Sequence, residues 1–161
     1  MSTTLHHTAH LLALPLPFLL TGYSLAASQN TTPHLLDLPA HTSTPTFREI
    51  FLRGAHLVVP LSLTHLAATT YLAYAGPAPQ RGPWLTAAAA TAFTGLWTAV
   101  VMGGNIRRLV AIAGAGREVQ EKATADLEAR RRIARWTRQN WVRVGAFLVA
   151  GLAGLRATLG N

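Results

Sequence analysis

Residues 84–104 read WLTAAAATAFTGLWTAVVMGG, an apolar stretch that contains no charged side chain. A helix of this length can cross the hydrocarbon core of a bilayer, which is about 30 Å thick. Three further apolar blocks lie near residues 10–27, 56–75 and 141–159. None of the four blocks alternates apolar and polar residues in the way of a half-buried strand. The sequence therefore predicts an all-α fold, a four-helix transmembrane bundle that forms a single membrane domain over residues 1–161.

The composition also favours a lipid environment. Half of the 161 residues are apolar and only 12% are charged, whereas about a quarter of the residues are charged in an ordinary soluble domain. The chain contains no cysteine. A disulfide, a thiolate nucleophile, an iron–sulfur cluster and a cysteine-ligated zinc are therefore excluded.

The first apolar block is the weakest of the four, because Pro15 and Pro17 interrupt it and it is barely long enough to span. A secretory signal peptide is the alternative interpretation. Signal peptides begin with a basic segment, and residues 1–9 contain no Lys or Arg. We therefore expect this block to be retained as a membrane helix.

Charge is concentrated in the connection between the third and fourth blocks, which carries Arg107, Arg108, Arg117, Lys122, Arg130, Arg131, Arg132, Arg135 and Arg138. The positive-inside rule places this basic loop in the cytosol and both termini on the lumenal or extracellular side. The chain has a net charge of +8, and the basic residues of this loop are interleaved with acidic ones. Attraction to the anionic headgroups of the lipid bilayer therefore explains it better than a nucleic-acid partner does.

The loop regions also carry secondary-structure signals. Residues 118–138 are rich in Glu, Ala and Arg, which predicts a cytosolic helical extension between helices 3 and 4 that continues into the fourth helix. The four helices are then expected at about 10–27, 56–75, 84–112 and 118–159. Residues 29–46 are polar and rich in Pro and Thr, which predicts a loop.

Two polar clusters flank the ends of the third and fourth blocks. In the first, Asn105 and Arg108 lie one helical turn apart. In the second, Trp136, Asn140 and Arg143 are spaced i, i+4 and i+7, which is one stripe of a helix. Because consecutive helices run antiparallel, the two clusters can converge at the cytosolic membrane boundary.

These residues predict a donor-rich pocket. Arg143 lies several residues inside an apolar run, where a cation is costly unless it faces the bundle interior, so a functional role is the default interpretation. The structural alternative is that the arginines reach the headgroups, that Trp136 belongs to an interfacial belt and that Asn140 is an interhelical strut.

The seven histidines form no compact metal-ligand spacing with carboxylates, so no metal site is expected. His56 and His65 lie in or beside the second apolar block. Each is a possible base, because imidazole titrates near neutral pH, and each is also readily explained as a buried histidine with one hydrogen bond.

The order of these features resembles the anthrone oxygenase family of small membrane proteins over nearly the whole chain. The resemblance rests on Gly-Tyr-Ser at 22–24, a Pro-containing loop, Arg-Gly at 53–54, Asn-Ile-Arg-Arg-Leu at 105–109, and the spacing of Trp136, Asn140 and Arg143. The chain departs from the family at 103–104, where Gly-Gly stands in place of the frequent Pro-Thr.

The resemblance implies an enzyme that oxygenates an anthrone-like polycyclic polyketide to its quinone in secondary-metabolite biosynthesis. No cofactor is then needed, and molecular oxygen is the co-substrate. Arg108 and Arg143 would stabilise an oxyanion, Asn105 and Asn140 would hydrogen-bond the substrate, and Trp136 would stack on it or donate its N–H.

Two other functions fit the same residues. A cyclase or isomerase of a hydrophobic natural product would use the same donors to polarise a carbonyl without oxygen. A non-catalytic membrane protein would bind lipid or a lipophilic aromatic molecule. A homo-oligomer is compatible with each of the three functions.

Overall fold

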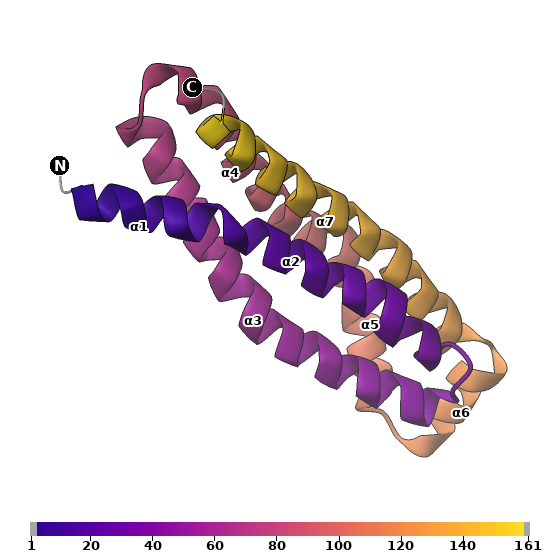
Figure 1. The fold of residues 1–161 in the computed structure, drawn as a ribbon. Helices are drawn as coiled ribbons and strands as arrows, with labels where there is room; N and C mark the ends of the chain where they lie inside the picture. Colours follow the sequence, from indigo (N-terminus) through magenta and orange to yellow (C-terminus); the bar gives the residue numbers. More distant parts are fainter. Residues whose placement is uncertain (1–2, 160–161) are drawn as a thin grey trace.

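The computed structural model describes residues 3–159 and consists of a four-helix bundle with a small helical cap at one end (Figure 1). The elements are α1 (Thr3–Ala13), α2 (Pro15–Ala26), η1 (Ala27–Thr31), η2 (Thr32–Leu35), α3 (Ala40–Ala75), η3 (Ala78–Gln80), α4 (Arg81–Trp97), η4 (Thr98–Met102), α5 (Gly103–Ala113), α6 (Arg117–Ala125) and α7 (Glu128–Leu159). They join into four rods that are long and apolar enough to cross a membrane: Thr3–Leu35, Ala40–Ala75, Ala78–Ala113 and Glu128–Leu159. The all-α fold class is confirmed.

The first rod is longer than the block predicted at 10–27. It begins at Thr3, and α2 restarts at Pro15 directly after α1 ends. Proline fits the first position of a helix, because its missing N–H would have no partner there. The chain then continues through the π-helical turn η1 and the 3-10 turn η2. The rod therefore extends on both sides of the predicted range.

The loop predicted at 29–46 is wrong for most of its length, because the helical turns η1 and η2 continue to Leu35 and α3 already begins at Ala40. Thr44 and Thr46 each donate a hydrogen bond to the carbonyl four residues earlier. The backbone N–H of Ala40 donates to Thr124 Oγ1 over 2.8 Å. A contact with a residue that distant in the chain stabilises the helix start, and the local composition gives no sign of it.

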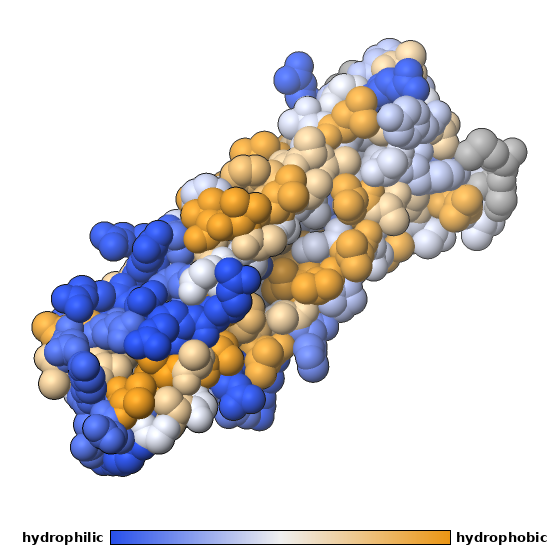
Figure 2. All heavy atoms as spheres, turned by 180° about the vertical axis from the view of Figure 1, so that it is seen from behind, coloured by the Kyte–Doolittle hydropathy of each residue, from blue (hydrophilic) through white to orange (hydrophobic). Residues whose placement is uncertain are grey.

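The basic end of the bundle is capped by α6. The helix predicted as continuous over 118–159 is interrupted between α6 and α7, where Leu127 has a φ of 53°. The interruption lets α6 fold back, so that Ala123 and Ala129 enclose Ile112 beside Ala40. Figure 2 shows hydrophilic side chains gathered at this end and hydrophobic ones along the middle of the bundle.

The start of α1 and the end of α7 are at the opposite end of the bundle from α6 (Figure 1). The turn between the first two rods and the basic connection meet at the other end, where the Arg130 guanidinium lies 3.7 Å from the Asp37 carboxylate. This arrangement agrees with four crossings. The cytosolic orientation of the basic end remains a prediction from its charge.

The core is divided along the bundle axis. Near the termini, Trp84 and Leu72 are buried, and Gly154 lets α7 approach the Trp84 ring, because a Cβ at Gly154 would lie 3.2 Å from it. Near α6, Phe47 and Met102 are buried in a second cluster. Small residues at helix contacts are typical of membrane bundles. The middle of the bundle, between these two clusters, contains the site.

Candidate functional site

A cavity of about 660 Å³ lies inside the bundle. Its wall is mostly apolar and is formed by α2, α3, α4 with η4, and α7. The lining residues used below are Tyr23, Ser24, Gly54, Val59, Ser62, Leu63, Thr91, Gly95, Leu96, Ala99, Trp136, Asn140 and Arg143. A cavity of this size suits a small organic molecule of drug-like dimensions.

One stripe of α7 supplies the principal polar wall. Trp136, Asn140 and Arg143 all line the cavity, as their i, i+4, i+7 spacing predicts. Trp136 and Asn140 are buried. The Trp136 ring packs edge-on against Phe47, with 5.3 Å between ring centroids, which fixes the indole plane.

Asn140 connects α7 to α2. Its Nδ2 donates to the Ser24 carbonyl over 2.9 Å and to Ser28 Oγ over 2.8 Å. Its Oδ1 accepts a hydrogen bond of 2.9 Å from Arg143 Nη1. The amide is therefore satisfied on both sides, and it orients the guanidinium beside the cavity.

Arg143 places a cation in the apolar wall of the cavity. Among residues 3–159, no carboxylate lies within ion-pairing distance of its guanidinium, which sits 6.0 Å from the centroid of the Phe147 ring. A charge inside a bundle is expensive to keep unless something stabilises it. An anionic or strongly polar oxygen of a bound molecule would supply the missing partner.

Several buried polar atoms of cavity-lining residues have no hydrogen-bond partner in the described part of the chain: Ser24 Oγ, Ser62 Oγ, Trp136 Nε1 and Arg143 Nε. Buried polar groups are satisfied in most proteins, and exceptions ask for an explanation. All four atoms belong to side chains that line one cavity, so the unused polar groups of this part of the bundle gather around that cavity.

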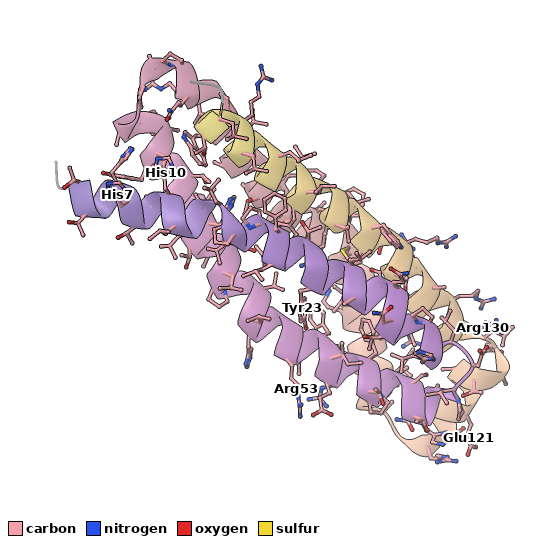
Figure 3. The ribbon with its side chains drawn as sticks, in the orientation of Figure 1. His7, His10, Tyr23, Arg53, Glu121 and Arg130 are labelled. Carbon is pink, nitrogen blue, oxygen red and sulfur yellow. The ribbon has the colours of Figure 1, made fainter. Side chains whose placement is uncertain are left out.

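Tyr23 and Gly54 narrow the cavity between α2 and α3. A Cβ at Gly54 would lie 2.7 Å from the Tyr23 hydroxyl oxygen, so only glycine lets this side chain lie against the backbone of α3. Figure 3 shows Tyr23 in the space between the two helices, while Arg53 points outward from α3. Of the Arg-Gly pair at 53–54, the glycine therefore contributes to the cavity.

The two candidate bases lie on opposite sides of α3. Nine residues separate His56 and His65, and nine steps of about 100° turn a side chain to the opposite face. His56 is exposed on the outer surface. His65 is fully buried, and its Nδ1 lies 2.8 Å from Thr91 Oγ1. Since Thr91 lines the cavity, His65 reaches the cavity through one hydroxyl group.

Asn105 and Arg108 lie outside the cavity wall. Asn105 lines a second, polar pocket together with Glu128 and Arg132, and Arg108 reaches that pocket only through Glu128. Arg108 makes a two-point ion pair with Glu128, with Nε to Oε1 at 2.9 Å and Nη2 to Oε2 at 3.0 Å. Asn105 Nδ2 donates to the Arg132 carbonyl over 2.9 Å. Arg132 also bonds Glu128 at 2.7 Å. The two predicted clusters thus occupy neighbouring but separate sites.

We expect Arg108→Ala to change the turnover of a cavity-bound substrate by less than about threefold, because a partly exposed ion pair contributes about 1 kcal/mol or less. Glu128 keeps its bond to Arg132 in this variant. Initial rates of wild type and Arg108→Ala, normalised to protein in the membrane, check the expectation. A loss of more than tenfold would place Arg108 in contact with the substrate.

Irregular turns border the cavity. The π-helical turn η4 carries Thr98 and Ala99 of the wall, and the other π-helical turn, η1, begins with Ala27, which also lines it. Trp97 Nε1 donates to the Gln139 carbonyl over 3.1 Å, which fixes the start of η4 to α7 next to Asn140. Single π turns within helices are frequent at functional sites.

Sequence reasoning did not single out Ser62 and Thr91 as wall residues. Each is a small hydroxyl residue inside an apolar block, and such residues commonly bond their own helix backbone. Only the packing of α3 against α4 shows which hydroxyl groups face inward. Tyr23 and Ser24 were included only as part of the resemblance.

Metal ligands are not grouped in the described residues. Within residues 3–159, no set of three or more His, Asp or Glu side chains is placed to hold a metal ion.

Fold and site together define a class, namely an all-α bundle of four helices long and apolar enough to cross a membrane, with a donor-lined apolar cavity inside. A family model described as anthrone oxygenase matches residues 47–153, which is more than half of the chain. The chain belongs to the anthrone oxygenase family, as the resemblance predicted. The name of the family suggests an oxygenase activity. No curated protein and no solved structure matches the chain.

Proposed function

We propose that this protein oxygenates an anthrone-like polycyclic molecule to its quinone, with O₂ as co-substrate and with the side chains of the cavity as the catalytic groups. The observation that carries the proposal is the Arg143 guanidinium, which has no acidic partner within residues 3–159 and lies at the wall of a largely apolar cavity in a member of the anthrone oxygenase family. Localisation in a membrane, with the basic end cytosolic, belongs to the same proposal.

The cavity suits a flat, mainly apolar substrate with oxygen atoms on its edge. Its volume of about 660 Å³ accommodates a tricyclic aromatic body. The apolar wall favours ring carbons. The oxygen-bearing edge would face Arg143 and Trp136, whose Nε and Nε1 have no partner in the described part of the chain.

The reaction needs no external reductant. A methylene carbon between two aromatic rings loses a proton, and the resulting anion is delocalised onto the carbonyl oxygen. The anion gives one electron to O₂, and the radical pair combines to form a carbon–oxygen bond and, after protonation, a hydroperoxide. Loss of the second methylene proton forms the new carbonyl, breaks the oxygen–oxygen bond and releases hydroxide, which leaves as water. One anthrone and one O₂ thus give one quinone and one water.

Arg143, oriented by its hydrogen bond to Asn140 Oδ1, stabilises the carbonyl oxygen as that oxygen acquires negative charge. Donors fixed in advance at such an oxygen contribute several kcal/mol to catalysis in low-dielectric sites. The Trp136 N–H is a further donor from the same stripe. Asn105 acts as a positioning residue, because the Arg132 carbonyl that it holds lies one turn before Trp136.

The proton acceptor is the pair formed by Thr91 and His65. The Thr91 hydroxyl takes a proton from the substrate and passes its own to His65 Nδ1, 2.8 Å away. The acceptor is buried, so the proton stays close to the peroxide that needs it in the next step. His56 has no such path, because it faces outward.

Membranes that contain the protein should convert a hydroxylated anthrone to its quinone faster than empty membranes, with one O₂ consumed per quinone. Product formation and O₂ uptake are measured in the same sample. A product formed without O₂ uptake would identify a cyclase or isomerase instead. Binding without any product would identify a non-catalytic binding protein.

A further inference from the structure

The cavity reaches the outer surface of the bundle between α3 and α4. On α7, Trp136 and Asn140 are buried and Arg143 is half-buried, whereas several lining residues of α3 and α4 are exposed. Val59 and Leu63 of α3 are 53% and 60% exposed, and Leu96 of α4 is 66% exposed. A residue that lines the cavity and also faces outward marks its mouth.

The mouth is entirely apolar. Besides Val59, Leu63 and Leu96, its exposed residues are Gly95 and Ala99, and none of the five has a polar side chain. Gly95 and Ala99 are four residues apart, so they lie on the same face of the helix. A Cβ at Gly95 would meet no atom within 4 Å. The α4 side of the mouth is thus kept open by small residues.

The mouth lies at the middle of the rods that would cross the membrane. Residues 95–99 are central in the rod Ala78–Ala113, and residues 59–63 are near the centre of Ala40–Ala75. A central position in a span of this kind corresponds to the hydrocarbon core of a bilayer, where lipophilic molecules dissolve. An aqueous ligand would meet no polar group at this entrance.

We infer that the substrate enters and the quinone leaves sideways through the bilayer, between α3 and α4, with Gly95 as the residue that keeps the passage open. The inference rests on the proposed function and adds the route. The ligand class is a flat lipophilic molecule whose oxygen-bearing edge leads inward. That edge meets Arg143 at the end of the passage, and its apolar body stays against Val59, Leu63 and Leu96.

The variant Gly95→Phe tests the route, with Gly145→Phe as its matched control. Both glycines are exposed, both are in helices, and a Cβ at either one meets no atom within 4 Å. Gly145 is on α7 and does not line the cavity. Phenylalanine adds bulk without a new tryptophan, so protein fluorescence remains comparable.

Binding of a hydroxyanthraquinone to the full-length protein in detergent micelles is followed by stopped-flow quenching of tryptophan fluorescence. We expect Gly95→Phe to slow association and dissociation by about tenfold each while Kd changes little, because a blocked passage alters rates and not the bound state. Gly145→Phe should match wild type. Turnover of the anthrone should fall in parallel with the association rate.

Equal association and dissociation rates in Gly95→Phe and Gly145→Phe would contradict the proposed route. So would a Gly95→Phe protein in which only dissociation becomes faster, since Gly95 would then be a contact of the bound ligand. A wild-type protein that binds the quinone but oxidises no anthrone would contradict the proposed function, and the binding rates would still decide the route. A wild-type protein that binds no quinone would contradict both.

Discussion

Replacing Arg143 by Met should lower kcat/KM for anthrone oxidation by about 10² to 10³-fold, which is the usual cost of removing an oxyanion donor. Methionine keeps an unbranched apolar stem in the wall and removes the charge. The thermal midpoint should fall only slightly. Within residues 3–159 the guanidinium has no acidic partner to lose, and an apolar side chain in the cavity wall offsets part of the cost of leaving Asn140 Oδ1 without its hydrogen bond. A loss of activity far larger than the loss of stability is the signature of a catalytic cation.

The matched control is Arg138→Met, which removes a charge from the same helix. Arg138 is exposed and does not line the cavity. The kcat/KM of Arg138→Met should stay within about twofold of the wild-type value, since single surface charges contribute little. Initial quinone formation and thermal unfolding are measured for both variants in the same lipid. If Arg143→Met kept wild-type activity, the proposed catalytic role of Arg143 would be contradicted.

Replacing Asn140 by Asp should lower turnover by about 10²-fold, because the introduced carboxylate pairs with Arg143 and cancels the charge needed at the developing oxyanion. The two side chains have nearly the same shape, and Arg143 Nη1 already lies 2.9 Å from Asn140 Oδ1. The change also removes the Nδ2 donor that bonds the Ser24 carbonyl and Ser28 Oγ. A moderate loss of stability, about 1 to 3 kcal/mol, should accompany it.

Ser28→Ala separates the two effects. It removes one of the Asn140 hydrogen bonds, and Ser28 does not line the cavity. This variant should lose stability without a comparable loss of turnover. If Asn140→Asp and Ser28→Ala lose turnover in proportion to their loss of stability, Asn140 would be a strut between α2 and α7 and nothing more. Denaturation midpoints and initial rates measured on the same preparations decide between the two.

The α7 part of the site was predictable because it depends on one helix. Trp136, Asn140 and Arg143 share a stripe at any helix orientation, and an arginine inside an apolar run is costly unless it faces inward. The placement of Asn105 and Arg108 depends instead on the register between two helices. Asn105 bonds the Arg132 carbonyl, which lies about 12 Å along the axis from Asn140 at 1.5 Å per residue.

The cap at the basic end sets that register. The break at Leu127 turns α6 back over Ile112, and the Thr124 hydroxyl receives the first N–H of α3. These contacts join residues far apart in the sequence, so helix-forming composition over 118–138 could not reveal them. The same limit applies to α3, whose first two turns are rich in Pro and Thr but are stabilised by the distant Thr124.

Helix geometry shows which of His56 and His65 faces inward once the inner face of α3 is known. Both residues were equal candidates on chemistry alone. Burial and the contact with Thr91 Oγ1 distinguish them, because only His65 connects to the cavity. The inner face of α3 is identified by its packing against α4. The sequence of α3 is only weakly amphipathic, so it does not predict which face packs inward.

The central claim is that the substrate is oxidised in the cavity beside Arg143 and not in the polar pocket beside α6. Initial rates of quinone formation and O₂ uptake by wild type, Arg143→Met and Arg108→Ala in lipid nanodiscs test it directly. The account predicts that Arg143→Met falls close to the spontaneous background while Arg108→Ala stays near wild type. Equal rates for the two variants, or a larger loss in Arg108→Ala, would contradict it.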